Sequence, residues 1–167
     1  MKNIFYLPIA LLLCVAASCS MQNNKTEDTT MATKVPGTEN NIYAVMAIND
    51  TIRTTDSVLL RFTVYNPTDS AKNFLKWQTP FEPLLSKYLD IKDEQGQEVA
   101  YIGAMAKRMM PPPADAYITI NSKDSLVTKV DVLKGYALTK PGKYTIEYNS
   151  ENISGLKVSK TVSFIYK

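Results

Sequence analysis

Short runs of β-branched and aromatic residues recur between residues 41 and 167, and clusters of Asn, Asp, Pro, Gly and Ser separate one run from the next. Apolar and polar residues alternate within these runs, as in β-strands whose side chains point to opposite faces. We expect the apolar face of each strand to line a core, and Asn66-Pro67 to end one strand in a turn. The clearest apolar face consists of Val58, Leu60, Phe62 and Val64.

The runs predict nine strands, and the segments between them have no helical period. Strands at this spacing favour two packed antiparallel sheets over a parallel α/β arrangement. We therefore predict an all-β fold, an immunoglobulin-like antiparallel β-sandwich of about seven to nine strands, over residues 39–167. The predicted strands are residues 43–48, 57–65, 72–77, 88–92, 98–102, 117–120, 126–132, 143–148 and 157–166.

The N-terminal segment has the pattern of an export signal, with Lys2 before an apolar stretch at 4–15 that is too short to span a bilayer comfortably. Small residues directly before Cys19 resemble a bacterial lipobox, which predicts a lipid on the Cys19 sulfur. Cys14 fits less well because three leucines precede it. We predict a lipoprotein signal peptide over residues 1–18. We also predict that the chain is exported to the cell envelope and held by its lipid at the outer membrane. Soluble secretion through an ordinary signal is the alternative.

Between the predicted anchor and the predicted sandwich, the sequence is polar and rich in Asn and Thr. Such a segment buries too little apolar surface to offset the entropy lost on ordering. We predict a flexible tether over residues 19–38, which would let the domain stand clear of the lipid surface.

The net charge and the residue types that the chain lacks limit the classes of function that we expect. The net charge is +3, from 19 basic and 16 acidic residues, which is too balanced for a nucleic-acid binder. The chain has no histidine, and its two cysteines both lie in the N-terminal segment, so imidazole and thiol chemistry are missing from the predicted sandwich. We predict no cofactor, no metal site and no catalytic residue: the chain is not expected to be an enzyme.

The segment from residue 103 to 116 interrupts the strand pattern, because methionines flank a basic pair and run into three prolines at 111–113. Prolines cannot donate to a sheet ladder, so one interpretation is a crossover that protects a sheet edge. The other is an adaptable methionine surface, stiffened by polyproline geometry, that docks a partner. The candidate partner-binding residues are Met105, Lys107, Arg108, Met109 and Met110.

Several short motifs occur in a distinctive order: W-x-T-P-x-E at 77–82, Y-x-G at 101–103, the basic pair at 107–108 and G-K-Y at 142–144. In this order they resemble the N-terminal, non-catalytic β-sandwich region of the deuterolysin and peptidyl-Lys metalloendopeptidase family. The resemblance implies the accessory fold alone, because the H-E-x-x-H zinc helix of that family has no counterpart here.

The residues of the first motif have ordinary structural explanations. We expect Trp77 to be an aromatic plug, Thr79 an extended residue before proline, and the Glu82 carboxylate an acceptor for turn amides.

An Asp followed by Ser or Thr recurs along the chain. With the residue after it, the triplet resembles the acceptor of the general O-glycosylation system of exported Bacteroidetes proteins. Asp-Ser and Asp-Thr are also natural turn exits before a strand, which is the structural alternative. The candidate glycan acceptors are Thr29, Thr51, Ser57, Ser70 and Ser125.

Together these features predict a non-catalytic lipoprotein of the cell envelope whose sandwich binds a protein, either an exported peptidase or another envelope protein. One alternative is a proteinase-inhibitor-like domain that offers the segment 103–116 to a protease. Another is a carbohydrate-binding module, which would need Trp77 or tyrosines exposed as an aromatic platform.

Overall fold

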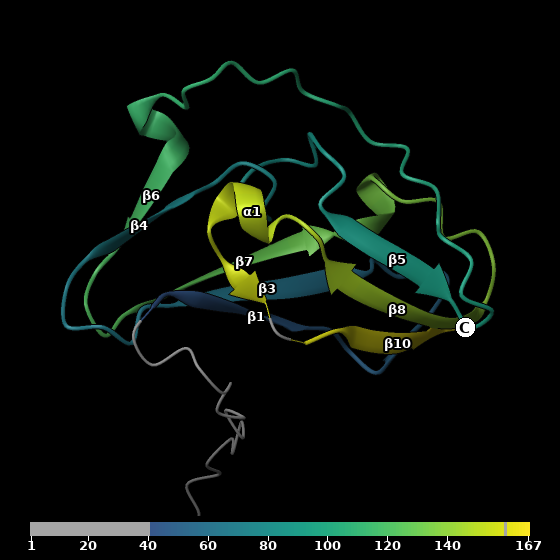
Figure 1. Cartoon of the computed structure of the whole chain (residues 1–167). Helices are drawn as coiled ribbons and strands as arrows, with labels where there is room; N and C mark the ends of the chain where they lie inside the picture. Colours follow the sequence, from purple (N-terminus) through teal and green to yellow (C-terminus); the bar gives the residue numbers. More distant parts are fainter. Residues whose placement is uncertain (1–40, 159) are drawn as a thin grey trace, which may run out of the picture. The chain divides into compact units, whose positions relative to one another are not determined.

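The computed structural model describes residues 41–158 and 160–167. Two four-stranded sheets and one two-stranded sheet make up this part of the chain (Figure 1). The predicted signal peptide, the tether, Cys19 and Thr29 lie outside the described residues.

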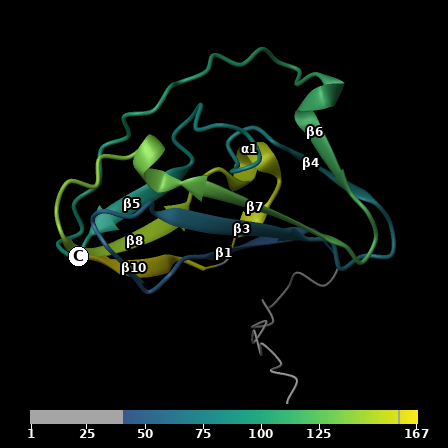
Figure 2. The same cartoon turned by 180° about the vertical axis from the view of Figure 1, so that it is seen from behind.

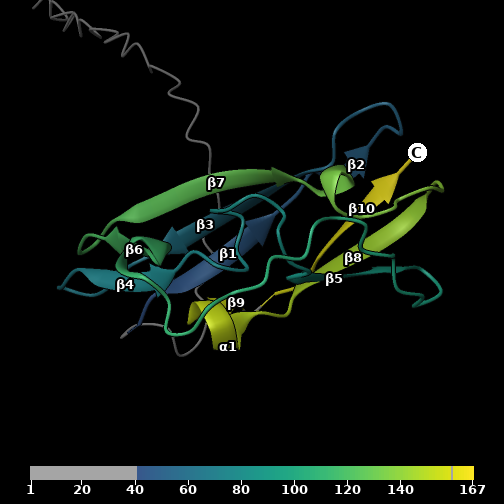
Figure 3. The same cartoon turned by 90° about the horizontal axis from the view of Figure 1, so that it is seen from above.

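The first sheet has the strand order β7-β3-β1-β9, and Figure 3 shows β7, β3 and β1 side by side. The second has the order β2-β10-β8-β5. Strands β4 and β6 form the two-stranded sheet. The bounds are β1 Tyr43–Ala47, β2 Thr51–Ile52, β3 Leu59–Tyr65, β4 Lys72–Leu75, β5 Leu89–Asp93, β6 Tyr117–Ile120, β7 Ser125–Asp131, β8 Gly142–Tyr148, β9 Lys157–Val158 and β10 Val162–Tyr166, with a short helix α1 at Glu151–Ser154.

Side chains from both four-stranded sheets share one core. The predicted apolar face is confirmed, since Val58, directly before β3, and Leu60, Phe62 and Val64 of β3 are each 0% exposed. Across the core the Phe62 ring lies 5.6 Å from that of Tyr148 on β8, measured between centroids. Burial of these aromatic and aliphatic side chains is the main stabilising term of such a fold. The predicted all-β sandwich is therefore confirmed.

Besides β2, which was not expected, three details differ from the expected strands. Residues 98–102 form only isolated bridges, Lys92 to Glu98 and Tyr101 to Tyr136. The run 157–166 divides into β9, which pairs parallel with β1, and β10, which belongs to the other sheet and pairs parallel with β2. The sheets are thus mixed at their edges, not purely antiparallel. Alternation within a run reports which side chains share a face, and it does not report which strand lies alongside.

A bent ribbon joins the first sheet to the small one. Tyr65 pairs with Ser125 where β3 meets β7, and Lys72 pairs with Ile120 where β4 meets β6. The β4–β6 pair therefore continues the β3–β7 pair past a bend, and it lies toward the side of the molecule away from the C-terminus (Figure 2). Asn66, 1% exposed, occupies this bend.

Candidate functional site

The segment 103–113, here called the strap, runs over the sandwich between Tyr101 and the short 3₁₀ turn that precedes β6 (Figure 1). Its side chains alternate between outside and inside: Met105, Lys107 and Met109 are exposed, while Ala106 and Arg108 are half-buried. Met110 is exposed as well. The three methionines are 72%, 83% and 77% exposed, in chain order. The predicted interruption of the strand pattern is confirmed, and the strap presents its methionines to solvent.

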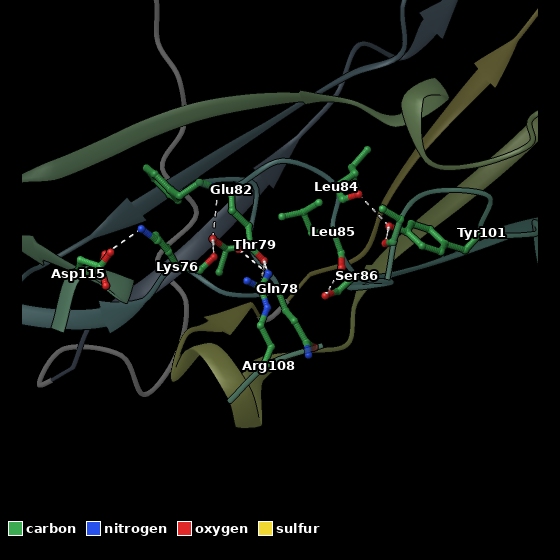
Figure 4. A network of polar contacts seen from close by, with 12 residues as sticks. Lys76, Gln78, Thr79, Glu82, Leu84, Leu85, Ser86, Tyr101, Arg108 and Asp115 are labelled. Carbon is green, nitrogen blue, oxygen red and sulfur yellow. Dashed lines mark hydrogen bonds and ion pairs between the residues drawn. The ribbon is translucent and has the colours of Figure 1, made fainter. Parts of the chain in front are cut away.

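Tyr101 fixes the beginning of the strap. Its hydroxyl lies 2.7 Å from the Ala104 carbonyl oxygen and 3.1 Å from that of Leu84, to which it can donate (Figure 4). A Cβ atom at position 103 would lie 2.5 Å from the same hydroxyl, so only glycine leaves room for this arrangement. The spacing of the Y-x-G motif thus follows from the contact of the ring with the strap.

Two further groups of hydrogen bonds hold the strap and the turn that follows it. The Ala106 amide donates to the Leu85 carbonyl at 2.7 Å. Beyond the strap, the Lys76 ammonium group donates to the Asp115 carbonyl at 2.8 Å, and the Lys76 amide donates to Ala116 at 2.9 Å. Backbone that is held at several points loses little further conformational entropy when it binds a partner.

The centre of the strap is held by what we call the clamp, formed by Arg108, Glu82 and Trp77. The Nη2 atom of Arg108 lies 2.8 and 2.7 Å from the two Glu82 oxygens (Figure 4). The guanidinium carbon stands 4.9 Å from the centroid of the Trp77 ring, a cation–π distance. The side chains of Glu82 and Arg108 are 6% and 23% exposed. A charge pair this buried holds its partners firmly, because neither ion recovers full hydration alone.

The first motif builds the turn that carries Glu82. Oε1 of Glu82 accepts the Gln78 amide at 2.8 Å, and the Thr79 hydroxyl donates to the Lys76 carbonyl at 2.7 Å. Trp77 is 8% exposed, in a small cluster with Leu75 and Ala116. The structural roles predicted for Trp77 and Glu82 are confirmed. Trp77 cannot be the aromatic platform of a carbohydrate-binding module, because its ring is buried.

The candidate partner-binding residues divide into two groups. Met105, Lys107, Met109 and Met110 are exposed, whereas Arg108 is engaged with Glu82 and Trp77. The sequence alone does not separate Arg108 from the other four residues, because nothing in a spacing of 26 positions points to Glu82. The structure therefore assigns Arg108 to holding the strap in place.

Replacing Arg108 with methionine is expected to lower the free energy of unfolding by about 2–3 kcal/mol, because the Glu82 carboxylate stays buried without its cation. The Ala106 amide, in the middle of the strap, should also exchange its hydrogen faster. Chemical denaturation and hydrogen exchange measure the two effects. Lys107→Met makes the same change at the exposed neighbour and should stay within about 0.5 kcal/mol of the wild type. Equal losses in both variants would contradict the clamp.

The predicted glycan acceptors that the structure describes are all accessible: Thr51, Ser57, Ser70 and Ser125 are exposed. The alternative explanation, that these pairs are turn exits before a strand, is supported at one of them. There the Asp124 carboxylate accepts the Ser125 amide at 2.7 Å. Exposure permits modification without requiring it, so O-glycosylation stays a prediction.

Within residues 41–158 and 160–167, no group of three or more Asp or Glu side chains is placed to hold a metal ion. In the same part of the chain, no helix has the length and apolar character needed to cross a membrane.

Comparisons with known proteins show which family and which proteins this chain resembles. Residues 46–152 match the family of immunoglobulin-like domains. An extracellular protease of Aeromonas hydrophila is 32% identical over 94 residues, which are 56% of this chain and 26% of that protease. An uncharacterized secreted protein of Arthroderma benhamiae is 29% identical over 108 residues, 62% of this chain and 55% of that protein. The chain thus matches about a quarter of the first relative and about half of the second.

These matches agree with the predicted resemblance at a general level: the matched region of this chain is immunoglobulin-like, and one relative is a protease. They do not specify the deuterolysin family, so that narrower resemblance stays a prediction. The match to the family covers more than half of the sequence, and this chain belongs to the immunoglobulin-like domain family.

Proposed function

We propose that this chain is a non-catalytic binding module that docks onto an exported protein through the exposed side chains of the strap. The observation that carries the proposal is the contrast between three exposed methionines, at 105, 109 and 110, and a strap that is held by its backbone at Ala104 and Ala106 and by the side chain of Arg108. Exposed apolar side chains gathered on one segment are typical of interaction sites. Their preorganisation removes part of the entropic cost of binding.

The chemistry of the strap favours one kind of partner surface. Methionine side chains are flexible and polarizable, so they fill irregular apolar grooves. Lys107 lies between two of the methionines and is exposed, and it makes no ion pair with the residues that the structure describes. The partner surface we propose is therefore an apolar groove with a carboxylate at its rim, because opposite charge steers association and fixes register.

An exported peptidase is the partner that we propose to carry this groove. The support is the similarity of the chain to about a quarter of an extracellular protease of Aeromonas hydrophila. We further propose that a lipid on Cys19 holds the module at the envelope, at the outer membrane, where exported partners pass.

The test is a triple variant, Met105→Ser, Met109→Ser and Met110→Ser, which removes the apolar side chains and leaves the clamp intact. The full chain, cross-linked in its native envelope, should capture an exported peptidase, and the purified pair should bind with a dissociation constant that rises at least about tenfold in the triple variant. Reversal of the neighbouring charge by Lys107→Glu should slow association.

Ile153→Ser is the matched control, because Ile153 is an apolar residue of α1 with 46% exposure, outside the strap. This variant should bind the peptidase as the wild type does. Capture that is independent of the strap, or equal weakening in the control, would overturn the proposal. Inhibition of the captured peptidase by the wild-type chain, lost in the triple variant, would identify the docking as inhibitory.

A further inference from the structure

A second surface feature is unrelated to the strap. A cleft of about 400 Å³ opens where β3 ends and β7 begins, at the bend of the ribbon. Two aromatic rings line it, together with the Asn66-Pro67 pair at the bend and three polar residues of the facing turn. These lining residues are Tyr43, Tyr65, Asn66, Pro67, Lys123, Asp124 and Ser125.

The aromatic part of the cleft is a stacked pair on one face of the first sheet. The rings of Tyr43 and Tyr65 lie 5.3 Å apart between centroids, with 23° between their planes. The two residues are direct partners across β1 and β3, and Tyr65 is in turn the partner of Ser125 on β7. Residues paired directly across a sheet point to the same face, so Ser125, Tyr65 and Tyr43 form one row. Tyr65 is 36% exposed, so this row is accessible from solvent.

The polar part of the cleft has little net charge. The Lys123 ammonium group lies 2.9 Å from the Asp69 carboxylate and donates to the Pro67 carbonyl at 2.7 Å, so its charge is already compensated. Asp124 adds a carboxylate, one oxygen of which accepts the Ser125 amide. A phosphate or sulfate group would meet this carboxylate without a free cation to balance it, and such a pairing is unfavourable.

We propose that this cleft binds a neutral saccharide, with a sugar ring against the face of Tyr65 that Tyr43 leaves free and its hydroxyl groups toward Asp124 and Ser125. A pyranose ring has an apolar C–H face and a rim of hydroxyl groups. Tyrosine offers an apolar ring face that ends in a hydroxyl, and a carboxylate accepts hydrogen bonds from sugar hydroxyls. Sites of this kind combine aromatic walls with a few polar groups that fix orientation. The aromatic wall of the site is thus the exposed Tyr65, backed by the half-buried Tyr43, and the buried Trp77 takes no part.

The proposal is tested by calorimetric titration of the full chain, produced without lipid or glycan and kept in a sugar-free detergent, so that the Ser125 hydroxyl is free. The probes are neutral tri- and tetrasaccharides of glucose, mannose and N-acetylglucosamine. At least one should bind with a dissociation constant of about 0.1–1 mM. Tyr65→Ala should weaken that binding by about tenfold or more, and Tyr65→Phe, which keeps the ring, should weaken it far less.

Tyr117→Ala is the matched control, since Tyr117 is 45% exposed on β6 and does not line the cleft. It should bind the same saccharide unchanged. The tyrosine variants should also keep a cooperative unfolding transition, because a cross-strand pair contributes only about 0.2–1 kcal/mol. The proposal is overturned if no saccharide binds saturably up to about 10 mM, if Tyr65→Ala binds as well as the wild type, or if inorganic phosphate binds in place of sugars. None of these results depends on the strap.

Discussion

Replacing Asn66 with alanine is expected to lower the free energy of unfolding by about 3 kcal/mol, through the loss of several hydrogen bonds at one buried bend. The Asn66 amide nitrogen lies 2.8 Å from Ser70 O, 3.1 Å from Ile120 O and 2.8 Å from Asn121 O. Its side-chain oxygen accepts the Thr68 amide and hydroxyl. Without these bonds, the bend between the main sheet and the β4–β6 pair loses its support.

Equilibrium denaturation measures the loss, and hydrogen exchange should show the β4 and β6 amides opening before those of the main sheets. Asn66→Asp is expected to be at least as damaging, because a carboxylate would face three carbonyl oxygens. Asn73→Ala changes an exposed asparagine of β4 and should stay within about 0.5 kcal/mol of the wild type. A small effect for Asn66→Ala, comparable to this control, would show that water replaces the bonds and would contradict the role assigned to the bend.

Raising the pH above about 10 is expected to lower the free energy of unfolding by roughly 4 kcal/mol per pH unit, from three buried tyrosines at about 1.4 kcal/mol each. Burial raises the pKa of Tyr88, Tyr136 and Tyr148 above the ordinary value of 10.0. Below pH 10 these groups are protonated in both states. Above it the unfolded chain releases the protons while the folded chain retains them, so the folded state loses relative stability.

Urea denaturation at several pH values between 9 and about 11.5 measures this slope, well above the ordinary tyrosine pKa. Tyr88→Phe should reduce it by about one third, since one of the three groups is removed. The Tyr88 hydroxyl has no hydrogen-bond partner among the described residues, so the same variant should lose no hydrogen-bond energy at neutral pH. A slope that is unchanged in Tyr88→Phe would mean that other groups govern alkaline unfolding.

Much of the fold could be predicted because its signal is local. Alternation along Val58, Leu60, Phe62 and Val64 identified the buried face of β3, and the Asn66-Pro67 pair marked the end of that strand. The prediction was wrong where partners decide the outcome. Residues 98–102 have strand-like composition, yet they form only bridges, and residues 157–166 are shared between two sheets.

The candidate site was predictable to a smaller degree. The methionines, the basic pair and the three prolines predicted an irregular segment at residues 103–116. The motif around Trp77 indicated a turn with a carboxylate acceptor. The spacing of residues gave no sign that Arg108 reaches Glu82, and therefore no sign that one member of the basic pair is engaged while Lys107 remains exposed. The tyrosine pair was equally hidden, because Tyr43 and Tyr65 meet only through the register of β1 and β3.

The sequence by itself determined the all-β class, the inward face of its main strands and the lack of imidazole, because these depend on residue types and on the two-residue period of a strand. The tertiary structure alone decided which distant residues meet: Glu82 with Arg108 at the strap, and Tyr43 with Tyr65 and Ser125 at the cleft. Such contacts depend on strand register and on the paths of long loops, and neither produces a periodic pattern in the sequence.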